Sequence, residues 1–267
     1  MALIDPLLIL ELAALGLCTG FLAGLLGIGG GMVMTPFLVM ILTARDHPDE
    51  YILKMAVATS LATICFTSLS SVWAHHRRGA VLWPVVRMLA PGILVGALLG
   101  AQVAVALPAK VLGVLFALFV GFSATQMFLN RRPEPSRTLP GPVGTFGAGT
   151  VIGALSSIVG AGGGFISVPF MSWCNVKIHE AVATSAALGF PIALFGTLGY
   201  VWAGQGLTQM PPGSFGYLYL PGLVVISLAS VTMAPLGART AHRMDVRPLK
   251  KLFAMLLYAL AAYFLLR

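Results

Sequence analysis

The sequence predicts an all-α, polytopic membrane protein built from two inverted-topology repeats. Of its 267 residues, 58% are apolar and only 9% are charged, whereas soluble globular domains carry about 25% charged residues. Long stretches without Asp, Glu, Lys or Arg are typical of membrane spans. This chain has them at 12–44, 55–76, 88–109, 111–130, 138–176 and 181–238. In addition, a glycine-rich phrase of the first half returns in the second half.

The glycine-rich phrase reads GIGGGMVMTPF from Gly27 and GAGGGFISVPF from Gly160, an offset of 133 residues. The phrase AVATS also occurs twice, at 56–60 and at 181–185. Three shorter echoes follow in the same order: Pro91-Gly92 with Pro221-Gly222, Gly100-Ala101 with Gly237-Ala238, and Pro108-Ala109-Lys110 with Pro248-Leu249-Lys250. Internal similarity of this kind indicates a duplicated structural unit. We therefore predict a first repeat at 1–129, a cytoplasmic linker at 130–141 and a second repeat at 142–267.

Each repeat contains five apolar elements that we expect to be helical. In the first repeat they lie at about 7–26, 32–43, 55–74, 84–105 and 109–129, and in the second at about 143–160, 165–175, 181–203, 216–237 and 249–266. In both repeats the first element ends at the glycine phrase, the third begins at or near AVATS and the fifth lies at the Pro-x-Lys echo. The second element has about 12 residues, too few to cross a hydrocarbon core of about 30 Å. The glycines are therefore expected to mark broken or re-entrant helices.

The distribution of basic residues predicts the orientation of the chain. An odd number of crossings in each repeat, or three crossings and a re-entrant pair, inserts the second copy upside down. The basic residues then divide twelve to four, and the smaller group comprises Arg45, Lys54, Lys110 and Arg267. Cytoplasmic loops carry the excess of Lys and Arg in membrane proteins. We therefore expect a multi-pass protein of the inner (plasma) membrane with basic loops and linker in the cytoplasm and both termini outside.

Inverted repeats with interrupted helices are typical of secondary transporters. A helix that begins inside the bilayer exposes unpaired N–H groups and about half a positive charge. Two such helix ends, one from each repeat, would form an anion site without a buried lysine. Hydroxyl groups near the glycines can also bind an anion's oxygens. The predicted substrate-binding residues are Gly29, Gly30, Gly31, Thr35, Thr59, Ser60, Gly162, Gly163, Gly164, Ser167, Thr184 and Ser185.

Structural explanations compete with this prediction. The AVATS hydroxyls can bond the carbonyl groups of their own helices instead. Small residues four apart also serve helix packing in membranes, and we expect that role at Gly20-xxx-Gly24, Gly96-xxx-Gly100 and Gly149-xxx-Gly153. Bulky replacement of Gly30 or Gly163 is expected to abolish transport and to leave membrane insertion intact.

Several other functions find no support in the sequence. The histidines and cysteines show no metal-ligand spacing, and no Lys-Ser/Thr follows the glycines as in a phosphate-binding loop. We therefore expect no metal, no cofactor and no catalytic residues. We also expect no nucleic acid partner, because basic cytoplasmic loops explain the formal charge of +8. Only Glu11 and Glu180 could approach membrane depth, so coupling through a buried carboxylate is not indicated.

The stretches GLLGIGGGMVMTPFL, SSIVGAGGGFISVPF, the twin AVATS phrases and HHRRGAV resemble the sulfite exporter TauE/SafE family of membrane permeases. The resemblance covers essentially the whole chain and implies transport of small sulfur-containing anions such as sulfite, sulfonates or sulfoacetate. An anion channel, a carrier for another small organic anion and an integral membrane enzyme are the alternatives. The expected partners are the small anionic substrate and the lipid bilayer, and a homo-oligomer is compatible with the sequence. Direction of transport and coupling ion stay open.

Overall fold

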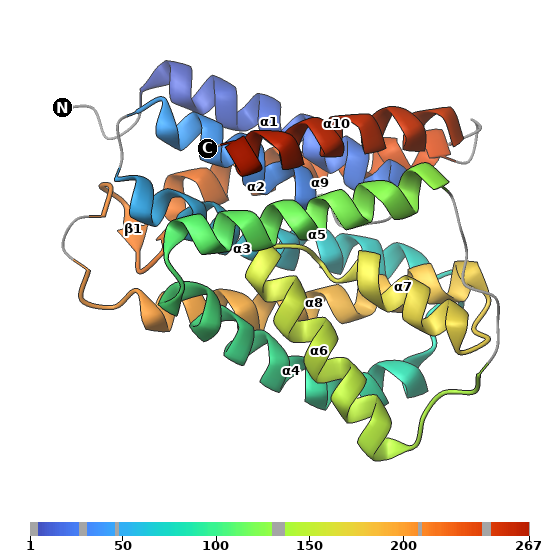
Figure 1. The fold of residues 1–267 in the computed structure, drawn as a ribbon. Coiled ribbons are helices and arrows are strands. Elements are labelled where there is room, and N and C mark those ends of the chain that lie inside the picture. Colours follow the sequence, from blue (N-terminus) through green and yellow to red (C-terminus); the bar gives the residue numbers. More distant parts are fainter. Residues whose placement is uncertain are drawn as a thin grey trace.

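Ten α-helices and one short β-hairpin make up the described part of the chain (Figure 1). The structure is a computed structural model that describes residues 5–26, 31–45, 48–129, 137–207, 210–241 and 247–266. The helices are α1 (Pro6–Leu26), α2 (Gly31–Thr43), α3 (Asp49–His76), α4 (Trp83–Ala106), α5 (Ala109–Leu129), α6 (Pro142–Val159), α7 (Gly164–Trp173), α8 (Ile178–Ala203), α9 (Leu220–Ala241) and α10 (Arg247–Leu266). The hairpin strands are β1 (Ser214–Phe215) and β2 (Leu218–Tyr219).

The helices confirm an all-α, polytopic membrane protein. Seven of those described are long and apolar enough to cross a membrane, namely α1, α3, α4, α5, α6, α8 and α9. The two helices that follow the glycine phrases are short, with 13 residues in α2 and 10 in α7. Large apolar side chains such as Leu10, Leu118 and Leu228 point outward and are more than half exposed. This outer surface suits lipid rather than water.

The helices pack in five main pairs: α1 with α9, α4 with α6, α3 with α8, α5 with α10, and α4 with α8. If α1–α5 correspond in order to α6–α10, the pair α1–α9 becomes α6–α4, and the pairs α3–α8 and α5–α10 become themselves. The pair α4–α8 becomes α9–α3, which also pack together but less extensively. Equivalent halves would produce this pattern. The start of α1 and the end of α10 also lie toward the same side, at the left of Figure 1. The inverted orientation of the halves stays a prediction.

Glycines allow the helix pairs α4–α6 and α1–α9 to approach closely. A Cβ atom added at Gly96 of α4 would overlap the carbonyl oxygen of Thr150 in α6. A Cβ at Gly20 of α1 would overlap the backbone of Ser230 in α9. Similar approaches occur at Gly16, Gly92, Gly100, Gly149 and Gly153. The packing role expected for Gly20, Gly96, Gly100, Gly149 and Gly153 is therefore confirmed, as is usual for small residues in membrane helices.

Two predicted boundaries are wrong by several residues. Helix α3 begins at Asp49 rather than near residue 55, because Asp49 and Glu50 in its first turn are favoured by the positive end of the helix dipole. The element expected from residue 216 begins only at Leu220. Residues 214–219 form the antiparallel hairpin instead, with positive φ at Gly213 and Gly216 at its turns. The Pro-Gly echo is not an equivalence either, since it lies deep in α4 but at the start of α9.

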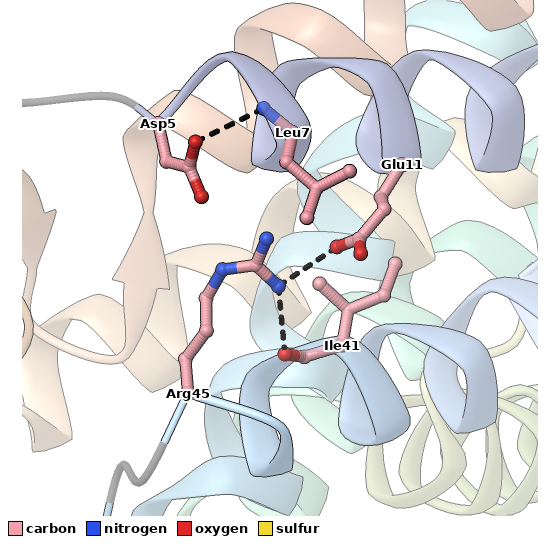
Figure 2. A network of polar contacts seen from close by, with 5 residues as sticks. All are labelled: Asp5, Leu7, Glu11, Ile41 and Arg45. Carbon is pink, nitrogen blue, oxygen red and sulfur yellow. Dashed lines mark hydrogen bonds and ion pairs between the residues drawn. The ribbon is translucent and has the colours of Figure 1, made fainter.

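An ion pair joins α1 to the end of α2 (Figure 2). Arg45 Nη1 lies 2.8 Å from Glu11 Oε2, and the same nitrogen donates a hydrogen bond to the carbonyl oxygen of Ile41 at 3.2 Å. The Asp5 carboxylate accepts a hydrogen bond from the N–H of Leu7 at 3.1 Å and caps α1. Glu11, one of the two acids that the sequence places near membrane depth, is thus paired with a cation, which is how spans tolerate charge.

Candidate functional site

The glycine breaks of the two halves meet beside α3. A Cβ atom added at Gly31, the first residue of α2, would overlap the carbonyl oxygen of Gly160, which follows α6. A Cβ added at Gly160 would lie 2.9 Å from Thr35 Oγ1 and 3.2 Å from the Cα of Val57 in α3. Gly29 and Gly30 lie outside the described residues. Gly31 and Gly160 therefore bring the two glycine phrases to one place in the molecule.

The second break is built by left-handed glycines. Helix α6 ends at Val159, and Gly160 follows with φ 73°. Gly163 precedes α7 with φ 77°, and Gly162 and Gly164 beside it are buried. Glycine adopts positive φ without the steric penalty that a side chain would bring. The sequence thus stops one helix and starts another within four residues.

The N-terminus of α7 has hydrogen-bond donors without partners. The N–H groups of Ile166 and Ser167 bond the carbonyl oxygen of Gly163, at 3.0 and 2.9 Å. Within the described part of the chain, no acceptor is assigned to the N–H groups of Gly164 and Phe165, and both residues are buried. Buried unpaired amides are rare in folded proteins. A helix N-terminus with free amides is suited to an anion.

Ser156 adds a hydroxyl to this end of α7. Its Oγ is fully buried and has no hydrogen-bond partner among the residues that the structure describes. A Cβ added at Gly163 would lie 3.3 Å from this oxygen. A buried hydroxyl without a partner is unfavourable, so a ligand that accepts a hydrogen bond from it would be stabilised there. The sequence prediction did not include Ser156, although its position one helical turn before Gly160 would place it at the break.

Hydroxyl pairs link each short helix to the AVATS phrase of the same half. Thr35 Oγ1 of α2 donates to Ser60 Oγ of α3 at 3.0 Å. Ser167 Oγ of α7 lies 2.7 Å from Ser185 Oγ of α8. All four side chains are buried. The structure therefore brings these predicted site residues together in pairs near the glycine breaks.

The two AVATS threonines make bonds that cross between the halves. Thr59 Oγ1 accepts the backbone N–H of Tyr219 at 3.1 Å, and Thr184 Oγ1 accepts the backbone N–H of Leu82 at 3.0 Å. Tyr219 and Leu82 directly precede α9 and α4. Each threonine thus holds the start of a helix of the other half, which differs from the expected alternative of bonding within its own helix. Its role in substrate binding stays a prediction.

Groups that could hold a metal are absent from the described ranges, where no three His, Cys, Asp or Glu side chains gather. The three cysteines are free thiols. The donors at the breaks are amides and hydroxyls, and this set suits an anion rather than a cation.

Comparison with known proteins places the whole chain among membrane transporters. The model of the family described as sulfite exporter TauE/SafE matches residues 12–264. A probable membrane transporter protein of Haemophilus influenzae is 36% identical over 247 residues, which cover 92% of this chain and 94% of that protein. A probable membrane transporter protein of Methanocaldococcus jannaschii is 24% identical over 266 residues, covering 99% and 96% of the two chains. No solved structure matches the chain significantly.

Proposed function

Because the chain belongs to the sulfite exporter TauE/SafE family, we propose that it is a secondary transporter that moves small sulfur-containing anions, such as sulfite or an organosulfonate, by alternating access. The chain is a membrane transporter and not an enzyme. The observation that carries the anionic character of the proposed substrate is the N-terminus of α7, where the free amides of Gly164 and Phe165 adjoin the unpaired hydroxyl of Ser156. These groups are buried at the place where both glycine breaks meet. The family description supports the sulfur-containing class.

An anion's oxygens would accept hydrogen bonds from these amides and from the Ser156 hydroxyl. The dipole of α7 adds partial positive charge to the same place. The hydroxyl pairs Thr35–Ser60 and Ser167–Ser185 lie close by and can reorient toward a bound oxygen. We assign Gly29–Gly31 the matching role in the first half.

The site favours an anion over a zwitterion. Its described members are glycines, serines, threonines and the backbone of Phe165, so no carboxylate among them is present to bind an ammonium group. Taurine, which carries both a sulfonate and an ammonium, should therefore bind less well than sulfite or sulfoacetate. An ammonium without an acceptor would be left unpaired in a buried place.

The proposed orientation puts the basic end of the molecule in the cytoplasm and both termini outside the inner membrane. Excess positive charge at one end supports it. So does the position of the start of α1 and the end of α10 toward the same side of the molecule (Figure 1). Inverted repeats of this kind place a substrate site near the middle of the bilayer.

Flux into proteoliposomes tests the proposed function. The purified protein is assayed with labelled sulfite, sulfoacetate, taurine, sulfate and a carboxylate of similar size. Saturable uptake of sulfite or sulfoacetate, with counterflow, is the expected result. Flux that neither saturates nor shows counterflow would identify a channel. Uptake of the carboxylate alone would overturn the sulfur-anion substrate.

A further inference from the structure

Lys54 is a buried cation in α3 that the proposed site does not use. Its side chain is 4% exposed. Its Nζ donates one hydrogen bond, to the carbonyl oxygen of Val105 near the end of α4, at 2.8 Å. An ammonium has three donors, and the described residues supply no further acceptor for it. The Glu50 carboxylate, one turn earlier on α3, acts on Lys54 electrostatically but forms no ion pair with it among the described residues. Charge inside membrane helices is expensive and is kept where function needs it.

The hairpin 214–219 covers Lys54. Nζ lies 6.0 Å from the ring centroid of Tyr217, in the turn between β1 and β2. The Tyr217 side chain is buried, and its ring lies tilted against that of Tyr51 and edge-on to that of Tyr200, with ring centroids 6.2 and 6.3 Å apart. Burial, with Tyr51 and Glu50 nearby, raises the pKa of Tyr217, so its phenol stays neutral. The cover over the cation is thus uncharged.

The hairpin is short and is held to α3 at its end. It has two residue pairs, Ser214 with Tyr219 and Phe215 with Leu218, and it lies near the start of α3 in Figure 1. The N–H of Tyr219 bonds the Thr59 hydroxyl at 3.1 Å. The hairpin is entered through Gly213, with φ 83°. Opening the hairpin would break this one side-chain bond to α3 and expose the buried Tyr217, Leu218 and Tyr219, so the open state is expected to be a minor one.

Helix α3 leads from Lys54 to the glycine breaks. Thr59 and Ser60 follow Lys54 on the same helix, and Ser60 lies about 9 Å farther along the axis at 1.5 Å per residue. Val57, which lies between Lys54 and Thr59 on this helix, is in contact with Gly160. The bond that holds the hairpin therefore sits next to the hydroxyl that pairs with Thr35.

We propose that Lys54 is a cation that an anionic substrate meets at this end of the transporter before it reaches the glycine breaks, and that the hairpin 214–219 is a lid over it, latched by Thr59. This inference rests on the proposed function. The other end of the molecule has a matching latch, Leu82 to Thr184. However, His179, which occupies the place of Lys54 at the AVATS offset, is exposed there. A lidded cation therefore belongs to one end alone.

Cysteine labelling tests the lid without reference to any substrate. A cysteine replaces Leu218, a hairpin residue that is 7% exposed, and labelling with a membrane-impermeant maleimide is followed in vesicles of both orientations. Labelling of the protein with only its native cysteines is subtracted. Thr59→Val should raise the labelling rate about 2- to 10-fold, the shift expected for the loss of one hydrogen bond. This rise in labelling rate should be seen in vesicles of one orientation only.

Two controls isolate the latch. Thr63→Val removes another buried hydroxyl of α3, which bonds the carbonyl oxygen of Thr59 within the helix at 2.9 Å, and it should leave the labelling rate unchanged. A cysteine at Phe215, which is exposed on the same hairpin, should label rapidly in every variant. Unchanged labelling in Thr59→Val, or an equal rise in Thr63→Val, overturns the lid.

Transport kinetics test Lys54 itself. Lys54→Gln keeps an N–H donor and loses the charge, whereas Lys54→Arg keeps the charge. Lys54→Gln should raise KM for sulfite uptake about 10- to 100-fold, as expected for one charge-assisted hydrogen bond, and Lys54→Arg should stay near the wild-type KM. A lower melting temperature with unchanged KM would show that Lys54 only caps α4 and would overturn its role. If the wild type carries another anion of the panel, KM is measured for that anion instead of sulfite. Failure of the proposed substrate is thereby distinguished from failure of the proposed role of Lys54.

Discussion

Gly31 lies directly against the carbonyl oxygen of Gly160, so closely that a Cβ atom on Gly31 would overlap it. The first residue starts the short helix of the first half, and the second ends a long helix of the second half. The meeting of the two breaks thus depends on the absence of a side chain.

Gly163→Leu should abolish transport and leave the amount of protein in the membrane unchanged. Positive φ costs an L-residue about 1–2 kcal/mol, and the new Cβ would collide with the side chain of Ile192. Uptake into proteoliposomes and the amount of protein in purified membranes are the measurements. Gly79→Ala is the control, because Gly79 also has positive φ but its Cβ would meet nothing within 4 Å. Normal transport by Gly163→Leu would show that this backbone does not form the site.

Ser156→Ala should weaken substrate binding without destabilising the protein. Its hydroxyl has no partner within the described part of the fold, so its removal there costs no hydrogen bond. The neighbouring Ser157 donates to the carbonyl oxygen of Ala97 at 2.8 Å. Ser157→Ala should therefore lose about 0.5–1.5 kcal/mol of stability with KM unchanged. The melting temperature and KM of both variants are measured. A lower melting temperature with unchanged KM in Ser156→Ala, or a raised KM in Ser157→Ala, would contradict the prediction.

Gly96→Leu should prevent close packing of α4 on α6 and lower the melting temperature sharply. The added side chain would enter the backbone of Thr150, and overpacking costs at least about 1–3 kcal/mol. Gly147→Ala on α6 is the matched control, since a Cβ there meets nothing within 4 Å and alanine favours the helix by about 1 kcal/mol. The control should melt at the same temperature as the wild type or higher. An equal loss in both variants would argue against a specific contact.

The ion pair of Glu11 and Arg45 should contribute modestly to stability. Both side chains are partly exposed, at 37% and 20%, and exposed pairs contribute about 0.2–1 kcal/mol. A double-mutant cycle with Glu11→Gln and Arg45→Gln, read by thermal melting in detergent, measures the coupling. A coupling energy of zero would mean that the ion pair in Figure 2 contributes nothing to the free energy of unfolding.

The repeated glycine phrase and its spacing were sufficient to predict that two breaks meet and that hydroxyls lie near them. Ser60 and Ser185 could be chosen because AVATS is duplicated. The partners of Thr59 and Thr184 could not, because they are backbone groups of Tyr219 and Leu82, far away in the chain. Such bonds depend on how the halves pack, which no local pattern records.

Lys54 illustrates a different limit. A lysine at the edge of a charge-free stretch is expected in a loop, yet α3 extends past it and the hairpin covers it. Gly213 and Gly216 are turn residues that the sequence displays openly. The apolar residues that follow them nevertheless favour the prediction of a helix from residue 216. A short apolar segment suits a helix and a strand equally, so the pattern alone does not predict the hairpin.

The pairing of α1 with α9 has a consequence for biosynthesis. Ser230 donates a hydrogen bond to the carbonyl oxygen of Gly16 across 214 residues of chain, so the face of α1 that carries Gly16 and Gly20 lacks its main packing partner until most of the polypeptide has left the ribosome. During that interval the first helix must wait in the bilayer or beside the insertion machinery. A chain that stops before residue 220 would keep these glycines without the helix that packs on them.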